Sequence, residues 1–272
     1  MEAQMKFNFY SLDINEDYDP AKQLKKFETM SEAHVRRRRL VRALPDFGEP
    51  GRALAERLTG CGFFRCRSAG CPVCLRAFRR WWGSTLAAYM SRDPDYWFTV
   101  SIVPPDLFDV GHLHRFRWKL LKDRLRNQIA RSQVNRAIFL GGMDYNLVHF
   151  ADDRAPRWRP HLYFLVGGGG QGLIEGAFRR HYPRDEDTPR PVVVTPQRTE
   201  DKDLMTTATY TFKARFENRR PCRDRRGNVD TETDELALPH QAELAILLDR
   251  QGFLGRAIRH GEDRYLPALT VR

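Results

Sequence analysis

Four of the five cysteines lie within fourteen residues, and this cluster constrains the fold more than any other feature of the sequence. They are Cys61, Cys66, Cys71 and Cys74, while Cys222 is distant. Because no apolar leader segment is evident, such short spacings favour metal binding over disulfides. Four thiolates close a tetrahedral site, for which zinc is the ordinary ion and an iron–sulfur cluster the alternative. We therefore predict a structural zinc knuckle on these four residues.

The charge of the chain indicates a polyanionic partner. The formal net charge is +11, and arginine supplies 38 of the 46 basic residues. Arginine binds phosphate bidentately and stacks on bases, which favours nucleic acid, although a GC-rich genome would also enrich arginine. No segment approaches the roughly 18 apolar residues of a membrane helix, so we expect a cytoplasmic protein without a membrane partner.

The order of expected elements indicates an α+β fold. Strands are expected at 96–103, 137–150, 158–166 and 192–194, with helices at 112–131, 173–181 and 203–216. This alternation is typical of the split βαβ arrangement of ferredoxin-like and RNA-recognition folds, in which helices back an antiparallel sheet. We therefore predict such a sheet, carrying a small zinc knuckle and a helical N-terminal extension.

The segments outside this core are read from turn residues and charge. We predict a helix over 20–42, a linker at 44–51, a helix over 75–89, and loops beyond residue 219 until a final helix at 240–260. The chain then divides into a basic helical extension (1–55), a zinc knuckle with its helix (56–90), the sheet-containing core (91–218) and a charged C-terminal loop and helix (219–272).

Arginines concentrate in a helical run, around the cysteines and beside one predicted strand. A charged run is ordinarily a solvated helix face, and phosphate contact is the sharper interpretation. The candidate DNA-binding residues are Arg36, Arg37, Arg38, Arg39, Arg65, Arg67, Arg76, Arg79, Arg80, Arg157 and Arg159.

Four local motifs resemble those of one known family. They are the knuckle ending Cys71-Pro72-Val73-Cys74, the strand Trp97-Phe98-Thr99-Val100-Ser101, the pair Gly141-Gly142-Met143-Asp144 and Pro160-His161-Leu162-Tyr163, and the segment Ala208-Thr209-Tyr210-Thr211-Phe212-Lys213. In this order they are similar to the motifs of rolling-circle replication initiators and related transposases, the His-hydrophobe-His (HUH) endonucleases. Each motif is weak alone, and their shared order carries the resemblance.

The resemblance implies a site-specific single-strand DNA endonuclease and strand transferase that initiates plasmid replication or transposition. Tyr210 would attack a phosphodiester and leave a 5′-phosphotyrosine. Lys213, one turn later on the expected helix, would hold the phosphate or assist the phenolate. Asp144, His161 and Tyr163 occupy the positions of ligands for catalytic Mg²⁺ or Mn²⁺. Single-stranded or hairpin origin DNA would be the partner, with unwinding left to a host helicase.

One position departs from the family pattern: Tyr163 replaces the second histidine, and a phenol of pKa about 10 is a poor ligand for a hard divalent ion. A water could bridge Tyr163 to the metal, or His149 or His181 could replace it. Alternatively, the site has decayed and the protein is a DNA-binding regulator or origin-binding accessory protein. Whether Asp144 shares a face with His161 depends on a hairpin register that the sequence does not fix.

Two further interpretations remain open from residue type alone. Tyr210 on a helix is ordinarily a packing residue, and His161 on an apolar strand is ordinarily a core histidine. The same sheet architecture also serves RNA-recognition modules, which present aromatic residues on two strands. RNA binding is therefore the third functional hypothesis.

Overall fold

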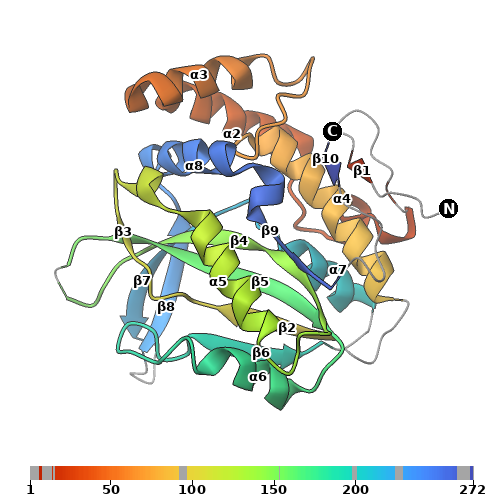
Figure 1. The fold of residues 1–272 in the computed structure, drawn as a ribbon. Helices are drawn as coiled ribbons and strands as arrows, with labels where there is room; N and C mark the ends of the chain where they lie inside the picture. The colour runs from red at the N-terminus through yellow and green to blue at the C-terminus, as the bar shows by residue number, and fades with distance from the viewer. Residues whose placement is uncertain are drawn as a thin grey trace.

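The computed structural model describes residues 6–7, 14, 16–91, 97–152, 154–197, 201–223, 229–261 and 270–271. Figure 1 shows a curled mixed sheet at the centre of the fold, surrounded by helices. Its strands are β2 (Trp97–Ile102), β3 (Phe108–Asp109), β4 (Ile138–Val148), β5 (Arg157–Gly167), β6 (Val192–Pro196), β7 (Glu217–Arg223), β8 (Val229–Glu235) and β9 (Ala257–His260). A separate parallel pair joins β1 (Lys6–Phe7) to β10 (Thr270–Val271).

Four antiparallel strands form the centre of the sheet in the order β6-β2-β5-β4. The longest pairing joins β4 to β5, from Ile138 opposite Gly167 to Val148 opposite Arg157. The helix α5 (Trp118–Ala130) lies between β2 and β4 in the chain, and α6 (Gln171–Arg179) lies between β5 and β6. The predicted α+β class, with a sheet backed by helices, is confirmed. The sheet is mixed rather than wholly antiparallel, because β7 pairs with β4 in parallel.

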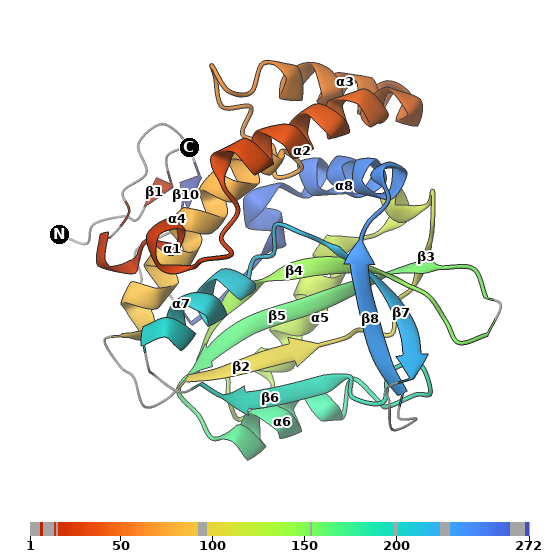
Figure 2. The same cartoon turned by 180° about the vertical axis from the view of Figure 1, so that it is seen from behind.

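Helices cover both faces of this sheet. On one face, the ring of Phe178 in α6 packs against Phe139 and Phe164 of the strands. On the other face lies α7 (Asp201–Tyr210), seen in front of the sheet in Figure 2. A Cβ atom on Gly142 of β4 would lie 2.6 Å from the carbonyl oxygen of Thr211, so only glycine permits this close approach.

A layer of helices lies above the sheet in the view of Figure 1. It comprises α2 (Met30–Ala43), α3 (Gly48–Thr59), α4 (Pro72–Met90) and α8 (Leu238–Arg256), with the short α1 (Pro20–Gln23) preceding them. A capping box begins α2, because Thr29 Oγ1 accepts from the amide of Glu32 at 3.2 Å and Glu32 Oε2 accepts from the amide of Thr29 at 2.7 Å. Among the described helices, none is both long and apolar enough to cross a membrane.

The prediction of a linker at 44–51 is wrong. A 3₁₀ helix, η2 (Leu44–Phe47), runs directly into α3. The prolines that suggested a linker lie in the first turns of these helices, where a missing amide proton costs no helical hydrogen bond. Leu54 and Leu58, four residues apart, are buried and supply the apolar face that stabilises α3.

The prediction of loops between residue 219 and the last helix is also wrong. β7 and β8 form an antiparallel hairpin there, and the predicted boundary at 218 falls within β7. Charged and polar residues dominate both strands, so the alternation that marks a half-buried strand is missing from the sequence. The last helix, α8, ends at Arg256, and the next four residues pair with β4 as β9.

Several predicted helices are shorter than expected, among them the helix over 112–131, which begins only at Trp118. The helix over 20–42 is divided into α1 and α2 by residues 24–29. The helix over 203–216 ends at Tyr210, so Lys213 lies beyond α7 rather than one turn along it. The early end of α7 changes how the side chains of Lys213 and Tyr210 meet.

Candidate functional site

The four clustered cysteines form a candidate metal centre. Their sulfur atoms all lie within 4.8 Å of one another. The Sγ atoms of Cys61 and Cys74, of Cys66 and Cys74, and of Cys71 and Cys61 are each 3.6 Å apart. A tetrahedral zinc site with Zn–S bonds of about 2.3 Å has sulfur atoms about 3.8 Å apart, so the spacing is consistent with a structural zinc. Four protein ligands would fill the coordination sphere and leave no position for a substrate.

Neighbouring helices hold this knuckle in place. Cys61 follows α3, and its amide donates to the carbonyl of Leu58 at 3.1 Å. Cys71 is the N-cap of α4, and Cys74 lies in the first turn of that helix. A Cβ atom on Gly70 would lie 2.2 Å from the carbonyl oxygen of Ala245, so the backbone packs directly on α8. The cluster is thus built into the junction of three helices.

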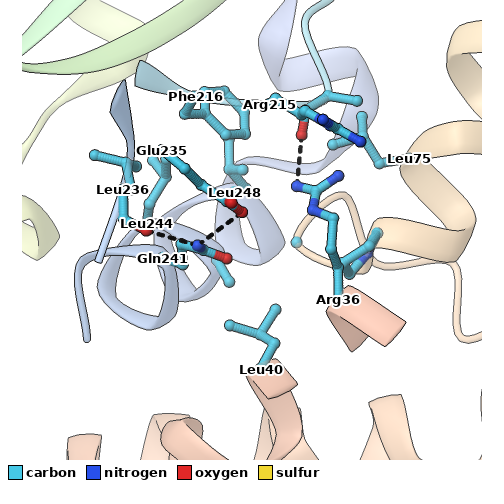
Figure 3. A pocket seen from close by; sticks show the side chains of 14 residues that line it. Arg36, Leu40, Leu75, Arg215, Phe216, Glu235, Leu236, Gln241, Leu244 and Leu248 are labelled. Carbon is cyan, nitrogen blue, oxygen red and sulfur yellow. Dashed lines mark hydrogen bonds between the residues drawn. The ribbon is translucent and has the colours of Figure 1, made fainter. Parts of the chain in front are cut away.

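Most of the arginines predicted to bind DNA make bonds within the chain. Arg36 ion-pairs with Glu28 at 2.6 Å and donates to the carbonyl of Ala214 at 2.8 Å, the latter bond drawn in Figure 3. The guanidinium of Arg37 donates to carbonyl oxygens of Leu58 and Thr59 at the end of α3. These two members of the 36–39 run therefore join α2 to neighbouring elements.

The arginines of α4 are used in the same way. Arg76 donates to the carbonyl of Glu28, Arg79 to that of Thr209, and Arg80 to the carboxylate of Asp19. Burial lowers the pKa of Arg79 to about 10. In β5, Arg157 pairs with Asp109 and Arg159 donates to Thr188.

The other four predicted arginines lie nearer to solvent. Arg38, Arg39 and Arg67 are exposed, and Arg65 is half-buried. Their role in DNA binding stays a prediction.

The register of the sheet brings the other predicted site residues to one face. Asp144 lies directly opposite His161 in the β4–β5 pairing. Ser101 in β2 lies opposite Tyr163, two residues along β5. Directly paired residues of antiparallel strands point to the same side, and so do residues two apart on one strand. The register that the sequence left open therefore places Asp144, His161 and Tyr163 together on the face that α7 covers.

Tyr210, the last residue of α7, lies over this face. Its side chain is 38% exposed, and its ring meets that of Tyr163 edge-on with 4.7 Å between centroids. The Nζ atom of Lys213 lies 4.3 Å from the centroid of the Tyr210 ring. Although Lys213 is beyond the helix, the turn after α7 returns its ammonium group to the tyrosine. The structure thus brings the two predicted catalytic residues together by a different route.

Two neighbours complete the charged part of the site. Glu217 Oε1 lies 3.4 Å from Lys213 Nζ, and Glu217 Oε2 accepts from Arg219 Nη2 at 3.0 Å. Burial raises the pKa of Glu217, while Lys213 and Arg219 lower it more strongly in sum, leaving the pKa below its ordinary value. Lys213, which lies against Tyr210, therefore belongs to a network with Glu217 and Arg219, and neither of these two residues was predicted. Both belong to β7, which the sequence did not reveal.

His161 is buried and uncharged at neutral pH. Its Nε2 atom lies 2.7 Å from the hydroxyl of Ser101, and Nδ1 has no partner among the described residues. Burial, together with the nearby charges of Lys213 and Arg219, lowers its pKa to about 3. Ser101 was not predicted as a site residue. The alternation of its strand, which places it on the side of Thr99, is the signal that could have found it.

Asp144 is bound by an arginine from α8. Arg256 Nη2 lies 2.6 Å from Asp144 Oδ1, and both side chains are buried. The second oxygen, Oδ2, has no partner among the described residues. Arg256 lies more than 100 residues away in the chain and belongs to no motif, so no sequence signal pointed to this pair.

The predicted ligands Asp144, His161 and Tyr163 do not fit a divalent ion. Burial raises the pKa of Tyr163, so its phenol stays protonated, and the carboxylate of Asp144 is ion-paired. A hard cation prefers several ionised or carbonyl oxygens. The histidines considered as replacements bond elsewhere: His149 to Asn218 at 2.7 Å and His181 to Arg180 at 3.0 Å. Among the described residues, only the cysteines gather as three or more groups able to hold a metal.

Comparisons of the chain with protein-family models, with curated proteins and with solved structures give no match.

Proposed function

We propose that the protein binds single-stranded DNA and cleaves it through Tyr210, as an initiator of rolling-circle replication or transposition does. One observation carries the proposal: a partly exposed tyrosine at a helix end, with the Lys213 ammonium 4.3 Å from its ring. A nucleophile on a rigid element beside a fixed cation suits attack on a phosphodiester. The strand order β6-β2-β5-β4, with α5 and α6 as connections, also agrees with the split βαβ fold that the motifs imply.

The proposed reaction transfers a phosphodiester from DNA to the protein. The Tyr210 hydroxyl oxygen attacks the phosphorus and loses its proton to solvent, and the bond from phosphorus to the 3′ oxygen breaks. The 3′ oxygen takes up a proton from solvent, while the phosphate stays on the tyrosine as a 5′-phosphotyrosine. A later attack by a 3′ hydroxyl reverses the transfer and rejoins the strand. The bond energy of the broken DNA phosphodiester is kept in the phosphotyrosine linkage, so rejoining the strand needs no other energy source.

Positive charge for this reaction comes from the protein in our proposal. Lys213 is buried and held beside Glu217, so its ammonium needs little reorganisation when charge develops on the phosphate. Arg219 adds a second cation next to the same carboxylate. Because Asp144, His161 and Tyr163 do not fit a divalent ion, no step is assigned to one.

The decisive experiment traps the covalent intermediate. Purified protein is incubated with a pool of random-sequence single strands and hairpins, then denatured, and strands that remain attached are sequenced. We expect an adduct with the wild type and with Tyr163→Phe, which retains the neighbouring ring, and none with Tyr210→Phe. The adduct should form with Mn²⁺ and also after added divalent ions are removed, with bound zinc measured in both samples.

A non-catalytic DNA-binding protein on the same fold is the second candidate. The observation that favours it is the ion pair between Asp144 and Arg256, which occupies a carboxylate that the metal-dependent family leaves for an ion. Tight binding of single-stranded DNA without an adduct from any strand of the pool would select this alternative. RNA binding through an open sheet is less favoured, because α7 and α6 lie over the two faces.

A further inference from the structure

A turn of the zinc knuckle exposes two adjacent aromatic side chains. Phe63 is 96% exposed and Phe64 is 76% exposed, more than any other large hydrophobic residue among those the structure describes. Both lie between Cys61 and Cys66, two of the four clustered cysteines. Full exposure of two neighbouring rings is unfavourable in water, and it is retained where the rings bind something.

The backbone that carries these rings is held at several points. The amide of Gly62 donates to the carbonyl of Phe64 at 3.4 Å, and Gly62 adopts a φ of +144° that other residues rarely reach. Arg37 of α2 donates to the carbonyl of Cys61. The two rings therefore project from a fixed turn, which lowers the entropy that binding would cost.

Guanidinium groups surround the base of this turn. A Cβ atom on Gly62 would lie 3.5 Å from Cε1 of His34 in α2. The same Cβ position would lie 3.8 Å from Nη1 of Arg37, and Arg65 directly follows Phe64 in the chain. Arginines therefore lie on both sides of the turn: Arg65 follows the aromatic pair and is half-buried, and Arg38 follows Arg37 on α2 and is exposed.

We propose that Phe63 and Phe64 form a stacking platform for the bases of single-stranded DNA, with Arg38 and Arg65 binding the adjacent phosphates. This inference rests on the proposed function and adds a second contact outside the Tyr210 site. Exposed rings combined with guanidinium groups are how proteins hold unpaired nucleotides without sequence preference. An apolar protein partner would instead favour a broad uncharged surface, and duplex DNA keeps its bases stacked inside.

The platform and Tyr210 belong to one connected unit. α4 begins at the knuckle and contacts α7 where a Cβ atom on Gly83 would lie 2.5 Å from Thr209 Cγ2. Cys74 and Gly83 are nine residues apart, about 14 Å along the helix axis. In this proposal, a single strand bound at Tyr210 extends along α4 toward the platform.

The test measures the affinity of the full-length protein for a fluorescently labelled oligothymidylate by anisotropy. We expect Phe63→Ala with Phe64→Ala to weaken binding at least about fivefold for each ring removed. Substituting both by tryptophan should preserve affinity, whereas substituting both by leucine should not. Leu120→Ala with Leu173→Ala removes two other exposed apolar side chains and is the matched control. Zinc content and far-ultraviolet circular dichroism verify that each variant is folded.

Three results would overturn the platform: unchanged affinity in the alanine variant, full affinity in the leucine variant, or an equal loss for a blunt duplex of the same length. These outcomes are separate from those of the proposed cleavage. A protein that forms the Tyr210 adduct but ignores the loss of both rings refutes only the platform. A protein that loses affinity with the rings but never forms an adduct refutes only the cleavage.

Discussion

Arg256 at the end of α8 binds the carboxylate of Asp144 in β4, with 2.6 Å between Nη2 and Oδ1 and no exposure of the guanidinium. The same side chain donates to the carbonyl oxygens of Met143 at 3.0 Å and Lys213 at 3.1 Å. Its bond to Met143 satisfies a carbonyl group in the stretch of β4 between the pairings with β9 and β7. One arginine ties the sheet to the turn that positions Lys213, and it uses a carboxylate that the sequence suggested for a metal.

Removing either member of this pair should destabilise the protein strongly. Arg256→Met or Asp144→Leu leaves a buried charge without its partner, and we expect each to lower the free energy of unfolding by about 3–5 kcal/mol. The double substitution should cost much less than the sum of the two. Urea denaturation of the wild type, both single variants and the double variant measures the coupling. Strictly additive losses would show that the pair contributes no interaction energy.

His161 should make stability depend on pH. Its pKa is about 3 in the folded protein, against an ordinary value of 6.5 for the unfolded chain. As the pH falls, the imidazole of His161 therefore binds a proton in the unfolded chain before it does so in the folded protein. The free energy of unfolding keeps its full contribution from the uncharged His161 above about pH 6.5 and loses it progressively toward pH 3. Linkage gives a loss of about 2 kcal/mol between neutral pH and about pH 5. Urea denaturation at a series of pH values gives the free energy of unfolding as a function of pH. This pH dependence should be weaker for His161→Gln than for the wild type, and an identical pH dependence would contradict the burial of an uncharged imidazole.

Lys213 should act on the rate of cleavage more than on DNA affinity. Replacing its charge by methionine removes a cation aimed at the developing charge, and such losses cost about 10²–10³-fold in rate. We expect single-turnover adduct formation by Lys213→Met to slow by that amount, while binding of single-stranded DNA changes little. Glu217→Gln, which preserves the cation and removes its ion-pair partner, is the control and should slow the reaction far less. A methionine variant as fast as the wild type would remove Lys213 from the mechanism.

The knuckle should contain one zinc ion per chain. Elemental analysis of protein purified without chelators is expected to find zinc, and to find it lost in Cys74→Ser, because three thiolates do not close the site. Cys222→Ser is a matched control, since this cysteine lies in β7, apart from the four clustered sulfur atoms. Metal loss should also lower the urea midpoint, because metal binding contributes to folding. Iron and inorganic sulfide in place of zinc would establish the cluster alternative.

Several features of the fold are determined by local sequence. The central strands and the helices between them were predictable, because hydrophobic periodicity and turn residues act over a few positions. The cysteine cluster was predictable for the same reason, since all four ligands come from one short segment. Tyr210 and Lys213 were close in the chain and remained close in space, even though the helix ended between them.

Long-range packing decided the rest. Leu54 and Leu58 turned an apparent linker into α3 by burial, and the polar hairpin of β7 and β8 carries no pattern of its own. Arginines that look alike in the sequence differ in space: Arg37 caps a helix, while Arg38 beside it is exposed. A pairing register and a partner more than 100 residues away determined that Asp144 faces His161 and yet binds Arg256. Backbone periodicity is a local property of the chain, whereas the partner of a charged side chain is chosen only when distant segments meet.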